Sequence, residues 1–147
     1  MRKDLEQAIA ENKKANKLYS TFGFRRMFSN VEKYLQHDEN ILYARNANVQ
    51  MDSSVALKPD AFFIRKKQPS IVIITDKRFL VYHRILPNEK LIQFPLEEIR
   101  SCDFSKDITS SKVRIVTLTK SIDIDLSCNS SEFELLNQVI AKAKINI

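Results

Sequence analysis

Side chains suited to catalysis or metal binding are few in this sequence and lie far apart. The chain contains two histidines, His37 and His83, and two cysteines, Cys102 and Cys128. Zinc sites use cysteines and histidines at close spacing, and a catalytic nucleophile needs a base beside it. Because neither arrangement is present, we expect no metal site, no cofactor and no catalytic residue, and we interpret the protein as a non-enzyme.

Glycine and aspartate give no stronger signal for catalysis. Phosphate-binding loops and dinucleotide fingerprints need two or three glycines, whereas this chain has one, Gly23. Asp123 and Asp125 lie two positions apart in a predicted strand, so both carboxylates share one face, and paired carboxylates can perform acid–base catalysis. Because they alternate with isoleucine and leucine, a solvated outer strand face explains the pattern.

Composition and charge are those of a globular protein. The 147 residues are 44% apolar and 29% charged, with a formal net charge of +6, which predicts one folded domain with its own core. The first residues lack the apolar stretch of a signal peptide, and no apolar run approaches the roughly 20 residues of a membrane span. Two cysteines fit a reducing compartment, so we expect a cytoplasmic protein.

The elements that would position these residues begin with helices. Residues 3–19 are rich in helix-forming side chains, but their apolar face is thin, because polar residues such as Asn12 interrupt it. Gly23 ends this pattern, and a second short helix is predicted over residues 29–37. A helix with so thin an apolar face must pack against another surface to be stable.

The remainder of the chain is predicted to consist of short strands and one helix. Residues 52–70 are expected to form a long connection, with a short strand at 62–65 as an alternative. The links between strands are too short for helical crossovers, so the sheet should be antiparallel. We expect seven strands, at residues 41–51, 71–75, 78–84, 90–94, 100–105, 113–119 and 122–126.

The last helix has the clearest signals. Ser131 and Glu134 form a capping box, in which each side chain bonds a backbone N–H of the first turn. Apolar residues then follow at helical spacing, and this stripe must be buried against the sheet. The residues of the stripe are Phe133, Leu136, Val139, Ile140 and Ala143.

Three motifs resemble those of the bacterial pleckstrin-homology-like (PH-like) domain family. They are the acidic start of the first strand at residues 37–42, the hairpin at 71–82 with its Thr-Asp-Lys-Arg turn, and the turn and strand at 94–102. The resemblance covers about residues 30–144. It implies a mainly β fold with α, in which a seven-stranded antiparallel barrel or sandwich is capped by the C-terminal helix. We therefore divide the chain into an N-terminal helical arm, 1–29, and a PH-like domain, 30–147.

Turn chemistry accounts for the residues of the Thr-Asp-Lys-Arg motif. Thr75 and Asp76 can bond backbone groups of the turn. Lys77 and Arg78 are expected to keep the turn soluble. This motif therefore predicts structure and gives no evidence of a ligand.

Basic residues supply one hypothesis about function. Residues 58–90 carry eight basic and three acidic side chains, an excess of +5. In PH-like folds the loop between the first two strands can hold phospholipid head groups, so the resemblance implies an anionic lipid or phosphate contact at Arg65, Lys66 and Lys67 in a basic loop over 58–67. We do not expect nucleic acid as a partner, because the strands lack a row of stacking aromatic residues.

An apolar segment between the two predicted helices supplies the other hypothesis. It could form a hinge whose rings pack onto the domain, or a docking surface for a second copy or a protein partner. We favour a non-enzymatic scaffold or binding module that associates with itself or with another protein, and we hold anionic lipid binding as the alternative. The residues of the predicted interaction surface are Phe22, Phe24, Met27 and Phe28.

Overall fold

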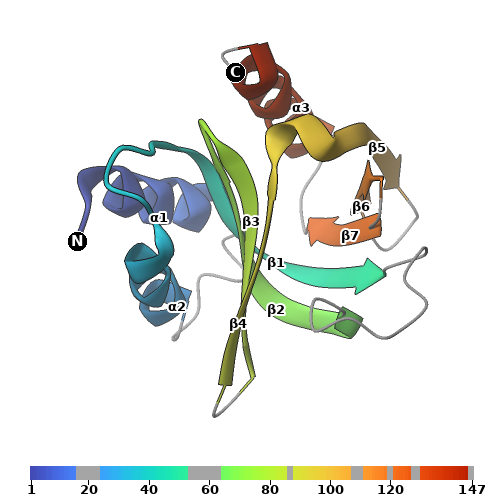
Figure 1. Cartoon of the computed structure of the whole chain (residues 1–147). Coiled ribbons are helices and arrows are strands. Elements are labelled where there is room, and N and C mark those ends of the chain that lie inside the picture. Colours follow the sequence, from blue (N-terminus) through green and yellow to red (C-terminus); the bar gives the residue numbers. More distant parts are fainter. Residues whose placement is uncertain are drawn as a thin grey trace.

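A seven-stranded antiparallel sheet forms the body of the protein, and helices pack on both of its faces (Figure 1). The computed structural model describes residues 1–15, 24–52, 64–85, 88–106, 111–118, 121–126 and 130–145. The helices are α1 (Lys3–Ala15), α2 (Phe24–Val31) and α3 (Ser130–Ile145), with short 3-10 helices η1 (Glu32–Tyr34) and η2 (Leu96–Glu98). The strands are β1 (Ile41–Asp52), β2 (Ile64–Thr75), β3 (Arg78–Ile85), β4 (Asn88–Pro95), β5 (Ile99–Lys106), β6 (Ser111–Thr117) and β7 (Ser121–Leu126).

The strand order is β4-β3-β2-β1-β7-β6-β5, and every pairing is antiparallel, which confirms the predicted sheet. β1 lies at the centre and joins the two halves. It pairs with β2 from Ile41 to Met51 but with β7 only from Asn48 to Asp52. The first part of β1 therefore extends beyond β7. No described helix is long and apolar enough to cross a membrane.

The first apolar cluster lies on the inner face of the sheet, the face that α3 covers. Leu136, Ile140 and Ala143 of α3 are buried in it, which confirms the predicted stripe. The rings of Phe79 and Phe94 stack within the cluster with centroids 5.0 Å apart. The helix begins at Ser130, so Ser131 lies in its first turn and not at the predicted capping position.

The second apolar cluster lies on the opposite, outer face, beneath α1 and α2 (Figure 1). Leu5 and Phe28 are buried there against Ile71, Ile73 and Leu80. β2 is therefore buried on both faces, because Val72 and Ile74 point into the first cluster and Ile71 and Ile73 into the second. This explains its continuous apolar run. The boundary that we propose between arm and domain, at residue 30, passes through α2.

Polar side chains of α1 complete the packing against β1. Asn12 is buried and forms two bonds to Asn46: its Oδ1 accepts the backbone N–H at 2.9 Å, and its Nδ2 donates to the side-chain oxygen at 2.5 Å. Asp4 Oδ2 accepts the N–H of Ile41 at 3.1 Å. Asn12 interrupts the apolar face of α1, and the structure shows why a polar residue is placed there. Its side chain bonds the backbone of β1 at Asn46, in the part of the strand that extends beyond β7.

Two predicted boundaries are wrong. The second helix was expected over 29–37, whereas α2 spans Phe24–Val31 and gives way to η1. Met27, Phe28 and Val31 have helical spacing, and burying them on the outer face draws the helix toward the N-terminus. The connection expected over 52–70 is shorter, because β2 already begins at Ile64.

Replacing Phe28 by Ala should lower the free energy of unfolding by about 3–5 kcal/mol, because a buried ring is lost from the second cluster. Urea denaturation followed by circular dichroism measures this change. Arg25→Ala on the same helix is the control, since Arg25 is exposed, and it should unfold like the wild type. An arm that folds independently of the sheet would leave the unfolding of the strands unchanged in Phe28→Ala.

Candidate functional site

The carboxylate of Glu39, which lies just before β1, is the centre of a buried cluster of polar groups. Arg78, at the start of β3, binds it with two nitrogens, at 2.6 Å from Nη2 to Oε1 and 3.0 Å from Nε to Oε2. The backbone N–H of Gln36 donates to Oε1 at 2.7 Å, and the Thr75 hydroxyl donates to Oε2 at 2.8 Å. Glu39 is fully buried, and each of its oxygens accepts two hydrogen bonds.

This environment keeps Glu39 ionised. Burial by itself would raise the pKa of Glu39, but the bonds from Arg78, Gln36 and Thr75, together with the charge of Arg78, outweigh it and hold the pKa below the ordinary 4.5. A carboxylate whose lone pairs are all engaged is a poor proton acceptor for a substrate. We therefore interpret this cluster as structural.

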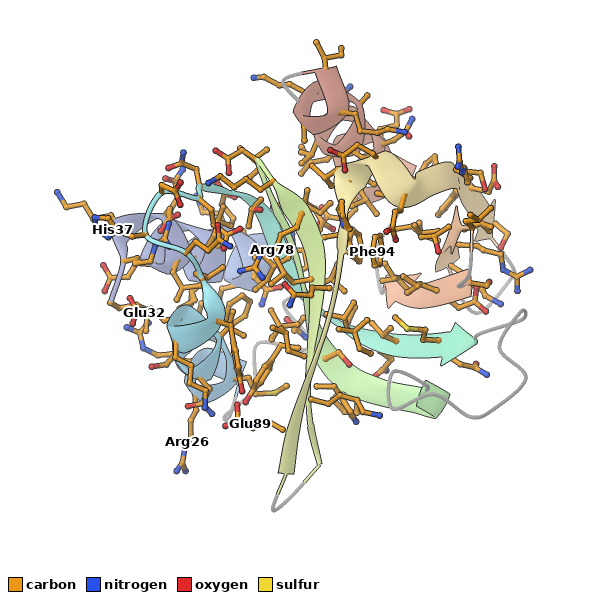
Figure 2. All side chains as sticks on the ribbon, viewed as in Figure 1. Arg26, Glu32, His37, Arg78, Glu89 and Phe94 are labelled. Carbon is orange, nitrogen blue, oxygen red and sulfur yellow. The ribbon has the colours of Figure 1, made fainter. Side chains whose placement is uncertain are left out.

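Arg78 corrects the expectation for the turn between β2 and β3. As predicted, Thr75 Oγ1 accepts the N–H groups of Lys77 and Arg78, at 3.1 and 3.0 Å. The Asp76 side chain bonds outside the turn instead, because its Oδ1 accepts the N–H of Asn40, just before β1, at 3.1 Å. Arg78, however, does not simply keep the turn soluble, because its side chain binds other parts of the protein. Its guanidinium also donates to the carbonyl of Tyr34 at 2.6 Å and to Gln93 on β4 (Figure 2).

The N-terminus is tied to the same cluster by Arg2. Its backbone N–H donates to Glu32 Oε1 at 2.6 Å, and its guanidinium binds Asp4 and the carbonyls of Gln36 and Glu39. Arg2 thus connects the start of α1 with η1 and with the segment that leads into β1. Sequence reasoning missed this cluster, because the bonds that join Arg2 to Glu32 and Gln36, and Arg78 to Glu39, connect residues 30 or more positions apart.

A second ion pair that the sequence did not reveal joins β1 to α3. Arg45 Nε donates to Glu132 Oε1 at 2.6 Å, and the hydroxyl of Tyr43 donates to the same oxygen at 3.0 Å. Both charged side chains are buried. The guanidinium also lies over the Tyr43 ring, 4.7 Å from its centroid. These contacts hold the first turn of α3 on the inner face of β1.

The basic residues predicted to bind anions lie in a strand and not in a loop. Gln68 pairs with Val49 and Ile64 with Met51, so β2 advances four residues where β1 advances two. Residues 65–67 therefore form a β-bulge, called here the basic bulge, which contains Arg65, Lys66 and Lys67. Their side chains and the rest of the predicted loop lie outside the described part of the structure. A bulge interrupts the alternation of a strand and redirects its side chains.

A row of residues crosses the sheet three positions beyond the basic bulge along β2. Ala47, Ser70, His83 and Lys90 are successive partners on β1, β2, β3 and β4. His83 is buried, and its Nδ1 lies 3.1 Å from the carbonyl oxygen of Pro69 and 3.5 Å from Ser70 Oγ. Its Nε2 is buried without a hydrogen-bond partner among the described residues.

His83 is held in its neutral form. Burial lowers the pKa of His83 below its ordinary 6.5; the bond to the Pro69 carbonyl opposes this change, and the charge of Lys90 adds to it. The neutral ring donates from Nδ1 to Pro69, which leaves Nε2 as a buried acceptor. Periodicity in the sequence gives no sign of this buried acceptor.

The predicted interaction surface is only partly placed. Phe28 is buried in the second cluster and Met27 packs half-buried against it. Phe22 and the side chain of Phe24 lie outside the described part. Arg26, next to Met27, projects away from the body of the protein (Figure 2). An interaction surface at the start of α2 therefore stays a prediction.

In the described part of the chain, the remaining candidates show no arrangement for catalysis. Asp123 pairs with Arg114 at 2.8 Å and Lys112 at 3.1 Å. Burial, with Asp103 nearby, raises the pKa of the Cys102 thiol to about 11, so it stays protonated. Cys128 lies outside the described residues. Within the described ranges, no three histidine, cysteine, aspartate or glutamate side chains come together to hold a metal ion.

Comparisons with known proteins agree with this architecture. The family model for the bacterial PH domain matches residues 35–142. Among solved structures, the N-terminal PH domain of Vps36 is similar, with a TM-score of 0.52 and 14% identity over 76% of this chain and 83% of that one. The linker-DH/PH domains of p115-RhoGEF give a TM-score of 0.52 at 12% identity, over 98% of this chain but 40% of that longer one. A search of curated proteins found no relative.

Replacing Glu39 by Gln should lower the free energy of unfolding by about 3–5 kcal/mol, because the guanidinium of Arg78, which is largely removed from solvent, then loses its counter-charge. Adding Arg78→Met should recover part of that loss, since neither charge remains. The stability that Glu39 contributes is fully present above its ordinary pKa of 4.5. It is lost as the pH falls through the lowered pKa that Glu39 has in the folded protein. Urea denaturation at several pH values measures both effects.

The exposed ion pair between Lys77 and Asp38 provides the control, with Nζ and Oδ2 2.6 Å apart. Lys77→Met should change stability little, because solvent screens this pair. If Glu39→Gln and Lys77→Met lowered the free energy of unfolding equally, the stabilising role given to the pair of Glu39 and Arg78 would be wrong.

Proposed function

Because the chain belongs to the bacterial PH domain family, we propose that it is a non-enzymatic binding module that holds an anionic group at the basic bulge. The fold is that of a binding or scaffold module, and the family match confirms the resemblance inferred from the three sequence motifs. The observation that supports the proposal is the register shift between β1 and β2, because the three consecutive basic residues fall within the stretch of β2 where it occurs.

The charge of the bulge supports an anionic partner. Three consecutive basic residues follow one another there without an acidic neighbour between 61 and 75. Each Lys or Arg near an anionic bilayer surface contributes about 1 kcal/mol of binding. Peripheral contact with the anionic inner leaflet fits a cytoplasmic protein, and we propose that location as well.

Reversing the three bulge charges, with Arg65, Lys66 and Lys67 changed to Glu, should weaken binding to vesicles of phosphatidylcholine and phosphatidylserine by about 100-fold or more. Co-sedimentation across a range of lipid concentrations measures this change. Raised salt should weaken wild-type binding in the same direction, since screening reduces the attraction.

The matched control reverses three exposed charges elsewhere, Lys3, Arg100 and Lys142, and so changes the net charge by the same amount. If the control loses as much binding as the bulge variant, the vesicles are attracted by the net charge of the whole protein and not by the bulge. Equal pelleting of wild type and bulge variant would refute the bulge as the contact.

Self-association through the start of α2 is the second candidate function. Since Phe28 is buried, we propose Phe22, Phe24 and Met27 as the contact residues, beside the exposed Arg25 and Arg26. Deleting residues 1–28 would not test this proposal cleanly, because it would uncover Ile71, Ile73 and Leu80 in the second cluster.

Changing Phe22 and Phe24 to Ser should convert an oligomer of the full chain into a monomer, because apolar contact area between copies is lost. Multi-angle light scattering measures the molar mass. Leu135→Ser on α3 is the control, since Leu135 is an exposed apolar residue away from α2. A wild-type protein that is monomeric at every concentration would rule out self-association.

A further inference from the structure

The two outer strands of the sheet, β5 and β4, differ in the protection of their outward edges. The register of β5 shifts between Ile99 and Ser101, and Lys144 of α3 donates to the carbonyl of Ile99 at 3.0 Å. The edge of β1 beyond β7 is occupied in turn by Asp4 and Asn12 of α1. Bulges and covering helices of this kind keep strand edges from pairing with other chains.

The edge of β4 shows neither kind of protection in the described part of the chain. Its 8 residues all pair with β3, and the register between them does not shift. No described strand pairs with the other edge of β4. Along it, Glu89, Gln93 and Pro95 are exposed. A regular and exposed strand edge of this length is a template for the addition of another strand.

The pairing with β3 determines which backbone groups of β4 point outward. The ladder ends at Ile85 and Asn88, with two residues between them in the sequence, and the closing pair of such a hairpin exchanges backbone bonds. Bonded and non-bonded pairs then alternate along the strands. The N–H and C=O groups of Glu89, Leu91 and Gln93 therefore point away from β3 and are the groups that an added strand would bond.

We propose that β4 pairs with β4 of a second copy of this chain, in antiparallel orientation about a two-fold axis at Leu91. In this register Glu89 of each copy lies opposite Gln93 of the other, and the two Leu91 residues lie opposite each other. Each of these pairs can exchange both of its backbone bonds. The inference goes beyond the proposed anion site, and it does not require the contact proposed at the start of α2.

Charge and backbone chemistry favour this register over its two neighbours. An axis at Lys90 would place two ammonium groups directly opposite each other, and like charges in that position are destabilising. An axis at Ile92 would use Pro95 in the bonded set, and proline has no N–H to donate. The axis at Leu91 avoids both of these costs.

The side chains that meet across the Leu91 axis are complementary. Leu91 is half-buried against the second cluster, so a second leucine opposite it extends an existing apolar contact. Arg78 binds Oε1 of Gln93, which leaves the Nε2 amide of Gln93 as a donor. Glu89, which accepts from Lys33 at 2.5 Å, is held at the strand edge to receive it. Because β4 complements a copy of itself, the structure favours a second copy over an unrelated peptide.

Sedimentation velocity of the full chain over a range of concentrations tests this association. Leu91→Lys should raise the dissociation constant of the dimer by about tenfold or more, because an apolar contact is lost and two ammonium groups face each other at the axis. Leu135→Lys, at an exposed leucine of α3, is the matched control. It changes the net charge equally and should associate like the wild type.

Cysteine cross-linking tests the position of the axis in folded protein. Opposite residues of a bonded antiparallel pair have Cα atoms about 5.5 Å apart, a separation that a disulfide can span. Mild oxidation should therefore link Leu91→Cys into a covalent dimer, whereas Glu89→Cys should link to Gln93→Cys and not to itself. The wild-type chain, oxidised in parallel, is the control for Cys102 and Cys128.

Three outcomes would count against the proposal. A wild-type chain that is monomeric at every concentration, with Leu91→Cys unlinked, overturns it, leaves the edge to a strand of another protein and does not affect the anion site. Association that Leu91→Lys leaves unchanged overturns the β4 contact and leaves the start of α2 as the surface for self-association. Equal weakening in Leu135→Lys and Leu91→Lys would show that net charge, and not the strand edge, controls the association.

Discussion

The ion pair between Glu39 and Arg78 joins the segment that leads into β1 to the hairpin of β2 and β3. Arg78 also binds the carbonyl of Tyr34 and reaches Gln93, so one guanidinium links η1, β3 and β4. A buried carboxylate and guanidinium tolerate few arrangements, because each needs its full set of partners. The pair therefore fixes how the chain passes from the helices into the sheet.

Burial on both faces is the second constraint on this sheet. The family model matches residues 35–142, yet Leu5 of α1 and Phe28 of α2 precede that range and pack on Ile71 and Ile73 of β2. The helices and the PH domain thus share one apolar cluster. The strands β1 to β3 carry apolar residues outward as well as inward, which would be unfavourable without the helices.

The parts of this fold that depend on residues close together in the sequence could be predicted from strand alternation, helical spacing and turn residues. The alternation of Ile122 and Ile124 in β7 and the stripe of α3 specified which faces are buried, and Thr75 specified its own turn. Contacts between distant residues left no such signal. Glu39 and Arg78 lie 39 positions apart, and the bulge at 65–67 exists only in the register with β1. The buried Nε2 of His83 is likewise set by neighbouring strands, so the candidate site was predicted by its charges and not by its geometry.

The bonds from Asp4 and Asn12 to β1 have a consequence for the solubility of shortened forms. In the stretch of β1 beyond β7, these side chains occupy backbone donors of Ile41 and Asn46 that a neighbouring strand would otherwise take. A protease that removes α1 would expose this edge together with the apolar outer face. An open edge templates pairing with other chains. Protein trimmed in this way should therefore aggregate through β1, an edge that α1 covers in the full chain.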